Sequence, residues 1–428
     1  MKTTASTFTL SAWLALAVIS AGTVARAGDV NLLGNLSVNS NLTAQSVTLA
    51  NVTVSNWNFA PLRGYKYVMV AEGTNDVHRG NNLLAAYAAT KTLNPSATNR
   101  VAVIVPPGAY NLGSTNLVMD TSYVNLIGLV PAQMTTKQVF IDNSGVTRTK
   151  TVANVDYTTY LYNGSSGSTI KQTVDNVRIE SVALKSTYLY GAYYPTVSGA
   201  NTVLRHVAML PSPQGWSMRR DVDYAGQYVD CVGSNESFSG GTASGTFVDC
   251  VGGDTSFGTG AASGTFIGCA AGHESFDAGE NSIADGTFID CVAGDDSFGG
   301  ESAVAFGTFI GCVAGRNAFG SWGADGTFID CVGGDESFGS QWGELGGTFI
   351  NCVGGAYSFS GYLSSTAKLR HCRGGSHSFE NFDMTSDDFN YNVGGSNTFL
   401  MLPNLPTSTN NLPSGSVYNS GGTLKVMP

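Results

Sequence analysis

Apolar and polar residues follow a repeating order between Cys231 and Cys372, where a cysteine returns every 19 to 22 residues. Each repeat carries a phrase such as Gly-Thr-Phe-Ile-Asp-Cys-Val-Ala-Gly-Asp-Asp-Ser-Phe-Gly, which runs from Gly286 to Gly299. A unit of this length cannot bury an apolar face by itself, so the repeats must stack on their neighbours. The period therefore predicts a solenoid with one coil per repeat.

Two apolar columns in this register predict where each coil bends. One column holds the cysteines, and the other stands three residues earlier and is Phe, Leu or Ile in most coils. Side chains alternate faces along a straight strand, so both columns can point inward only if the backbone bends between them. The residue before each cysteine is of a type that tolerates a left-handed backbone. We therefore expect the bend at Asp230, Asp249, Gly268, Asp290, Gly311, Asp330, Asn351 and His371.

A third apolar column stands seven residues after each cysteine and consists of phenylalanine. We expect these rings to point inward from a strand of the next sheet, and offset stacking to add stability beyond their burial. The members are Phe238, Phe257, Phe276, Phe298, Phe319, Phe338, Phe359 and Phe379.

Upstream of the repeats, the residues from Asn82 to Leu93 have helical spacing of apolar side chains without Gly or Pro, and predict a helix. The segment from Val101 to Tyr110, Val-Ala-Val-Ile-Val-Pro-Pro-Gly-Ala-Tyr, predicts a strand that ends in a turn. With this helix and strand, the chain resembles the pectin-lyase-like superfamily, in which a helix covers the N-terminal end of a β-helix and such a strand opens the first coil. The resemblance spans residues 72–399.

The resemblance implies an all-β fold, a right-handed parallel β-helix solenoid with an N-terminal capping helix and short β segments as stalk and tail. It also implies that the bend before each cysteine corresponds to the two-residue bend between the second and third sheets of that superfamily. It leaves the activity open, because the superfamily holds lyases, hydrolases, esterases, adhesins and phage tailspikes.

The chain is expected to divide into five segments. The first, 1–27, is typical of a secretory signal peptide, since Lys2 precedes an apolar run and Ala25-Arg26-Ala27 forms a cleavage pattern. We therefore expect the mature protein to be secreted, extracellular or on the cell surface. The other segments are a β-rich stalk or linker (28–63), a cap with irregular coils and loops (64–228), the regular Cys/Phe coils (229–400) and a tail or hairpin (401–428).

Two interpretations of the 28–63 segment stay open. Its short apolar strands could form a fibrous stalk that winds with other copies, for instance as a homotrimer, or a loose strand pair that leads into the coils.

Composition and charge narrow the range of partners. The chain has 54 glycines and only 12% charged residues, which fits short strands and turns. Without Lys2 and Arg26, the 21 basic residues become 19 against 31 acidic ones, so the mature net charge is about −12. No basic run is present to follow a phosphate backbone, and nucleic acid is not expected as a partner. After signal cleavage, no apolar stretch reaches the roughly 20 residues that a transmembrane helix needs.

Eight cysteines in an exported chain leave two interpretations. Adjacent coils would place their Cα atoms within the range that a disulfide allows. In-register parallel neighbours project their side chains side by side, however, which favours a ladder of buried thiols that act as small apolar groups.

Candidate chemistry lies four and five residues after each cysteine, on the outer side of the coil. Carboxylates one coil apart could serve as a glycosidase pair or bind calcium, and the superfamily resemblance implies a substrate groove along the first sheet and its adjoining turn. The alternative is a solvated turn in which Arg316 pairs with Asp295 and Asp335. The catalytic candidates are Glu274, Asp295, Asp296, Arg316 and Glu336, and the candidate calcium ligands are Asp254, Asp295 and Asp335.

A second candidate surface is rich in tyrosine and precedes the regular coils. Aromatic side chains on loops of a rigid scaffold suit stacking against sugar rings, although they could equally pack the loops onto the solenoid. The candidates are Tyr188, Tyr190, Tyr193, Tyr194, Trp216 and Arg219.

The regularity of the repeats favours an exported, non-catalytic β-helix that binds polysaccharide or another cell surface. The alternative is a polysaccharide lyase or glycoside hydrolase that uses the carboxylate column with calcium. The sequence lacks the Gly-His-Gly motif of the polygalacturonase branch, which counts against the alternative.

Overall fold

The structure is a computed structural model of the 428-residue chain. It describes residues 66–129, 133–136, 153–156, 158–164, 167–186, 191–210, 222–239, 241–258, 260–276, 283–300, 303–340, 343–364, 366–379, 389–390, 417–420 and 423–426. The expected signal peptide and stalk lie outside these residues.

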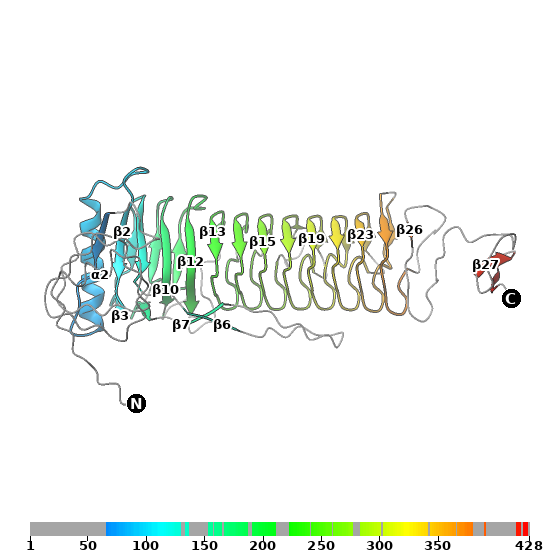
Figure 1. Cartoon of the computed structure of the whole chain (residues 1–428), viewed down its shortest axis with the longest axis horizontal. Helices are drawn as coiled ribbons and strands as arrows, with labels where there is room; N and C mark the ends of the chain where they lie inside the picture. Colours follow the sequence, from blue (N-terminus) through cyan, green and yellow to red (C-terminus); the bar gives the residue numbers. More distant parts are fainter. Residues whose placement is uncertain are drawn as a thin grey trace, which may run out of the picture. The chain divides into compact units, whose positions relative to one another are not determined.

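Parallel strands from successive coils pair in register and form a β-helix (Figure 1). The predicted parallel β-helix with its N-terminal helix is therefore confirmed. The longest sheet runs through β1 (Lys66–Met69), β2 (Val101–Val105), β5 (Val124–Gly128), β10 (Arg178–Lys185), β12 (Val203–Leu210), β13 (Gln227–Val229), β14 (Thr246–Val248), β15 (Thr265–Ile267), β17 (Thr287–Ile289), β19 (Thr308–Ile310), β21 (Thr327–Ile329), β23 (Thr348–Ile350), β25 (Lys368–Arg370) and β26 (Phe389–Asn390).

Shorter sheets form the other sides of the coils. The first half of the stack also contains β3 (Gly108–Asn111) and β8 (Thr159–Tyr162), which join the long sheet, and a sheet of β4 (Leu117–Met119), β9 (Ile170–Gln172) and β11 (Tyr193–Pro195). The regular coils carry a sheet of two-residue strands: β16 (Ile283–Ala284), β18 (Val304–Ala305), β20 (Gly323–Ala324), β22 (Glu344–Leu345) and β24 (Tyr362–Leu363).

Two antiparallel hairpins complete the set of described strands. One joins β6 (Gln133–Thr136) to β7 (Ala153–Asp156), and the other joins β27 (Val417–Ser420) to β28 (Thr423–Val426). The second hairpin lies within the 401–428 segment.

The helix α2 (Asp76–Lys91) packs against β1, β2 and β3 at the N-terminal end of the stack (Figure 1). It begins six residues earlier than predicted, because the side chain of Asn75 accepts a hydrogen bond from the His78 N–H at 2.8 Å and caps the helix. Gly80 lies inside the helix, where a Cβ atom would come within 1.9 Å of the Asn111 carbonyl oxygen. Gly80 is therefore required by the close approach of the helix to β3. The helix predicted from the sequence began after this glycine. Within the described residues, no helix is long and apolar enough to span a membrane.

The bend before each cysteine lies where the sequence predicted it. All eight residues have φ between +50° and +65°, and Ser181 and His206 adopt the same conformation in two earlier coils. In-register side chains at this bend contact one another: His206 lies 3.1 Å from Asp230, and the Asn351 amide donates to Asp330 at 3.0 Å. The left-handed residue turns the backbone so that the Phe and Cys columns both point inward.

Two phenylalanine stacks fill the core of the regular coils. Phe288 lies parallel to Phe309 at 4.8 Å between ring centroids, and Phe276 lies parallel to Phe298 at the same spacing. The two stacks meet edge to face, as between Phe288 and Phe298 at 5.4 Å and 80°. Both arrangements suit the quadrupole of the aromatic ring.

The second stack is buried as predicted, but its expected strand is absent. All eight of its phenylalanines have φ between +53° and +64°, in a turn rather than in a sheet. This conformation is costly for a residue with a large side chain, by roughly 1 to 2 kcal/mol. Ring stacking in the core offsets the strain, and sequence alone gave no sign of it because Phe is not a residue type that favours this region.

The eight cysteines are free and buried, as in the favoured thiol ladder. The sulfurs of Cys231 through Cys352 lie near a carbonyl oxygen of an earlier coil: Cys291 Sγ donates to the Phe266 oxygen at 3.3 Å and Cys312 Sγ to the Phe288 oxygen at 3.4 Å. Burial raises the pKa of the Cys250, Cys269 and Cys312 thiols well above the usual range. These thiols are therefore protonated and shielded from oxidants in the folded chain.

The strained phenylalanines predict an unusual order of mutational effects. Phe298→Ala should lower the free energy of unfolding by about 3 to 5 kcal/mol through the lost ring. Phe298→Gly should be about 1 kcal/mol less damaging than Phe298→Ala, because glycine adopts positive φ without strain. At Phe288, which lies in a strand, Gly should be more damaging than Ala. Denaturant unfolding of the four variants tests this, and the same order at both sites would contradict the strain.

The thiol ladder predicts a simple titration. Without reductant, a thiol reagent should label no cysteine of the regular coils in the folded protein and all eight after denaturation. Fewer than eight labelled cysteines in the denatured protein would show that disulfides form.

Candidate functional site

The polar residues four and five places after each cysteine, which we call the outer column, lie on the turn before the next buried phenylalanine. The residue five places after each cysteine has φ between +50° and +58° in every regular coil, so the turn keeps one shape throughout. A ladder of buried serines fixes it from inside: the Ser256 N–H donates to Ser275 Oγ at 3.2 Å, and the Ser275 N–H to Ser297 Oγ at 3.1 Å. Equivalent side chains therefore stand in rows along the solenoid.

One carboxylate oxygen at the first position of the column accepts a backbone hydrogen bond. Asp254 Oδ1 accepts the His273 N–H at 3.0 Å, Asp295 Oδ1 accepts the Arg316 N–H at 2.8 Å, and Asp335 Oδ1 accepts the Ala356 N–H at 2.7 Å. Each of these carboxylates thus ties its coil to the next one.

A glycine in the next coil makes room for each of these carboxylates. A Cβ atom at Gly272 would lie 2.0 Å from Asp254 Oδ1, and one at Gly315 would lie 1.9 Å from Asp295 Oδ1. The recurring Gly-Asp pair in the sequence is therefore a packing motif, in which the glycine of one coil receives the aspartate of the coil before it.

The three expected calcium ligands do not converge. Asp254, Asp295 and Asp335 are separated from one another by an intervening coil, which carries His273 or Arg316 at the same position. Strands in a sheet are about 4.8 Å apart, so successive members of the trio lie roughly 10 Å apart. The described residues contain no group of three or more His, Cys, Asp or Glu that could hold a metal ion.

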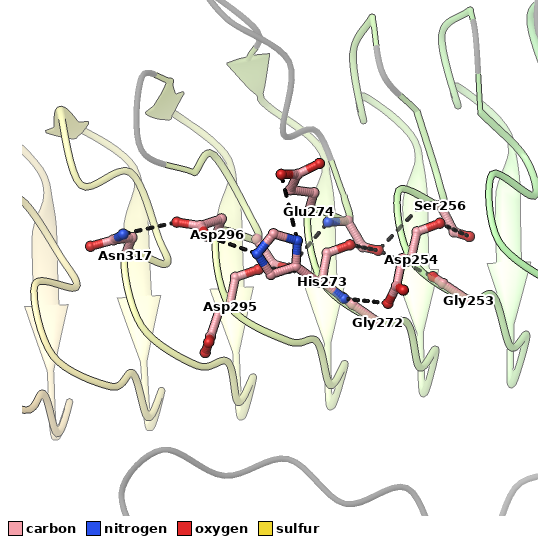
Figure 2. A network of polar contacts seen from close by, with 11 residues as sticks. Gly253, Asp254, Ser256, Gly272, His273, Glu274, Asp295, Asp296 and Asn317 are labelled. Carbon is pink, nitrogen blue, oxygen red and sulfur yellow. Dashed lines mark hydrogen bonds and ion pairs between the residues drawn. The ribbon is translucent and has the colours of Figure 1, made fainter.

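His273 joins the catalytic candidates Glu274 and Asp296 (Figure 2). Its Nε2 lies 3.0 Å from Asp296 Oδ2 and its Nδ1 lies 3.5 Å from Glu274 Oε1. The other oxygen of Asp296 accepts a hydrogen bond from the Asn317 amide at 2.9 Å. The carboxylate of Asp295 points away from the imidazole in Figure 2, so the adjacent pair Asp295 and Asp296 does not act as one unit.

Arg316 has a different partner from the one expected. Its guanidinium lies 2.8 Å from Glu336 Oε1, whereas Asp295 binds its backbone N–H and Asp335 binds the backbone of Ala356. The predicted pairing of Arg316 with Asp295 and Asp335 is wrong, because the backbone hydrogen bonds of the coil stack already occupy both aspartates.

In this column, His273 and its two carboxylate neighbours form the arrangement best suited to proton exchange. The imidazole is 48% exposed and has a carboxylate on each side, an arrangement that can hold a proton or pass it on. An open hollow of about 700 Å³ lies away from His273, at the start of α2, where Thr74, Asp76, Asn111 and Tyr162 contribute to its lining.

Of the six candidates for the tyrosine-rich surface, Tyr193 and Tyr194 are among the described residues. Tyr193 is 1% exposed and its hydroxyl donates to the Gln172 side chain, so the prediction that it stacks on a sugar is wrong. The alternation of strand β11 turns this residue into the core. Tyr194 is half-buried, with Lys171 Nζ 6.0 Å from the centre of its ring. The remaining candidates, Tyr188, Tyr190, Trp216 and Arg219, lie outside the described residues.

An exposed aromatic group lies elsewhere, beside the sheet of two-residue strands. Phe306, Trp322 and Tyr362, which we call the aromatic patch, are 47%, 57% and 59% exposed. Phe306 follows β18, Trp322 precedes β20 and Tyr362 begins β24. Ala303, Glu344 and Asp325 stand at the equivalent places of neighbouring coils. The sequence reasoning missed these residues, although their departure from the repeat was a usable signal.

No family model matches the chain, and no curated protein matches it at a significant level. Among solved structures, the chain is similar to pectin methylesterase PemA from Erwinia chrysanthemi, with 12% sequence identity and a TM-score of 0.24. The alignment covers 78% of this chain and 90% of that one. Similarity at this level says nothing about the activity of the present chain.

The hydrogen bond of Asp295 predicts a difference between two substitutions. Asp295→Asn keeps an oxygen for the Arg316 N–H and should change the free energy of unfolding little, whereas Asp295→Ala should lower it by about 1 kcal/mol. Thermal unfolding with calcium and with chelator tests this. A calcium site at Asp295 would instead make both variants equally damaging and would lower the stability of the wild type in chelator.

Proposed function

We propose that this protein is an exported, non-catalytic β-helix that binds polysaccharide through its aromatic patch. The observation that supports this proposal is the exposure of Phe306, Trp322 and Tyr362 on one side of a rigid stack of coils. Single exposed apolar residues are common, but a group of exposed aromatic side chains on one face often marks a binding site. The apolar faces of sugar rings pack well on such rings, while sugar hydroxyls stay in water.

The shape of the sheet favours a linear ligand. The strands of the sheet pair in the order β16, β18, β20, β22 and β24, so the patch spreads over four successive coils, with Glu344 in the coil of β22 between Trp322 and Tyr362. Ile283 and the half-buried Val304 add apolar surface to the same face. A polymer that lies along the stack could contact several rings at once, which multiplies weak contacts.

The carboxylate column supports a non-catalytic role. Asp254, Asp295 and Asp335 hold the backbone of adjacent coils, and Glu336 pairs with Arg316. Removal of the three aspartates would weaken contacts between coils. Export and a location outside the cell belong to the same proposal, and the signal-peptide pattern in 1–27 supports them.

A second candidate is favoured by one observation, the position of His273 between Glu274 and Asp296. A half-exposed imidazole between carboxylates could act as an acid or base in a polysaccharide lyase or glycoside hydrolase. Release of unsaturated or reducing ends from a panel of polysaccharides, lost on His273→Ala or Asp296→Asn, would establish this activity and overturn the non-catalytic proposal.

The binding proposal predicts a loss of retention without a loss of stability. The triple variant Phe306→Ala, Trp322→Ala, Tyr362→Ala should bind an insoluble neutral polysaccharide at least about tenfold more weakly, since exposed aromatic anchors contribute on the order of 1 kcal/mol each. A matched control, Met69→Ala, Val77→Ala, Val118→Ala, removes apolar groups of 39% to 49% exposure elsewhere and should bind normally. Equal binding by all three proteins, or no binding by the wild type across a broad panel, would refute the proposal.

A further inference from the structure

The last regular coil reverses the charge of the coils before it. From Asp230 to Glu344 the sequence has 17 acidic residues and one basic residue, Arg316. Residues 345–367 carry no charged side chain, and the following 12 residues, Lys368 to Phe379, contain Lys368, Arg370 and Arg373 with two histidines and no acidic residue. The solenoid is therefore acidic, then neutral, then basic along its axis.

The basic residues occupy the outward positions of an otherwise normal coil. Lys368, Arg370 and Arg373 are exposed, while Leu369 and Cys372 between them are fully buried. In the preceding coil their in-register neighbours are Thr348, Ile350 and Val353. The core pattern is thus kept and only the outer surface has changed, so packing does not explain the substitutions.

These three cations lie on both sides of a bend. Lys368 and Arg370 point outward from β25, about 7 Å apart by strand geometry. His371 turns the backbone at φ +56°, and Arg373 lies beyond it, beside Val353. A linear polymer can follow this bend and contact all three side chains, whereas a flat surface can contact only one face at a time.

The preceding acidic coils do not neutralise these cations. No ion pair involving Lys368, Arg370 or Arg373 forms within the described part of the chain. The uncharged coil places Asp330 and Asp335 two coils away, roughly 10 Å, which is about one Debye length at moderate salt. Arginine in particular forms paired hydrogen bonds with carboxylate, sulfate and phosphate groups.

We propose that Lys368, Arg370 and Arg373 form a binding site for a linear anionic polysaccharide that wraps the bend of the last regular coil. This rests on the proposed polysaccharide binding and extends it, because the site is separate from the aromatic patch and selects for negative charge. The two sites would hold one polymer by two kinds of contact, stacking at the patch and ion pairing at the coil.

The test uses the full chain and three soluble polymers: polygalacturonate for carboxylate, dextran sulfate for sulfate, and dextran as the neutral control. The variant Lys368→Thr, Arg370→Ile, Arg373→Val copies the residues of the preceding coil and so preserves the fold. The control variant Lys66→Thr, Lys185→Thr, Arg205→Thr removes the same charge from exposed positions in β1, β10 and β12. Circular dichroism melts check that both variants are folded.

The wild type and the control variant should bind at least one anionic polymer, with affinity that falls steeply between low and high salt. The coil variant should lose about tenfold or more in affinity, as three ion pairs of about 0.5 kcal/mol each would give, and the carboxylate and sulfate arms identify the preferred anion. The triple variant of the aromatic patch should keep most of this binding. A loss of binding in one variant but not in the other therefore shows which of the two proposed sites binds the polymer.

Four outcomes would overturn the proposal. The coil and control variants could weaken equally, which would show a general charge effect, or the wild type could bind neither anionic polymer. Salt-dependent dimers that disappear in the coil variant would assign the coil to a second copy of the chain. Binding that develops only after neutralisation of Glu380, Asp383, Asp387 and Asp388, which follow in the sequence, would assign the coil to the chain's own acidic segment.

Discussion

In-register stacking of the coils is the constraint on which the rest of the structure depends. Each side chain lies beside its equivalent one coil away, so an inward residue must pack well against a copy of itself. Phenylalanine meets this demand through parallel rings at about 4.8 Å, as in Phe288 and Phe309, and the small cysteine side chain meets it through a sulfur that contacts a backbone carbonyl. The stack is strong enough to hold a second phenylalanine column in a left-handed backbone, which sequence preferences disfavour.

The same constraint makes rows of like charge unfavourable, and the chain avoids them in identifiable ways. At the bend before the cysteine, Asp290 stands between Gly268 and Gly311, and a Cβ at Gly311 would lie 2.5 Å from Asp290 Oδ1. Further along, Asn351 donates to Asp330. On the outer turn, His273 and Arg316 interrupt the carboxylates, and the aspartates of the first position are neutralised in part by backbone N–H groups. Much of the acidic pattern is therefore structural.

Function is then expected where a coil departs from the repeat on its outer surface. Substitutions there do not disturb the shared core, so a single coil can carry a side chain that its neighbours lack. The aromatic patch and the basic coil are both departures of this kind, and they occupy different sides of the same scaffold. A scaffold of repeated coils can in this way present several weak binding groups at fixed spacing to one long ligand.

The sequence by itself determined the coil period, the inward columns and the residue at which each coil bends, because these follow from a strict spacing that only one stacking register satisfies. It also placed the N-terminal helix, although Gly80 hid the helix start until the proximity of Asn111 explained that glycine. Tertiary structure alone decided which polar groups were left for function. The partner of Arg316, the burial of Tyr193 and the role of the Gly-Asp pairs depend on contacts between residues about 20 positions or more apart. The local sequence pattern does not specify such contacts. Backbone N–H groups of one coil can bind a carboxylate of the coil before it only after the coils have stacked, and they then compete with side chains such as Arg316 for that carboxylate.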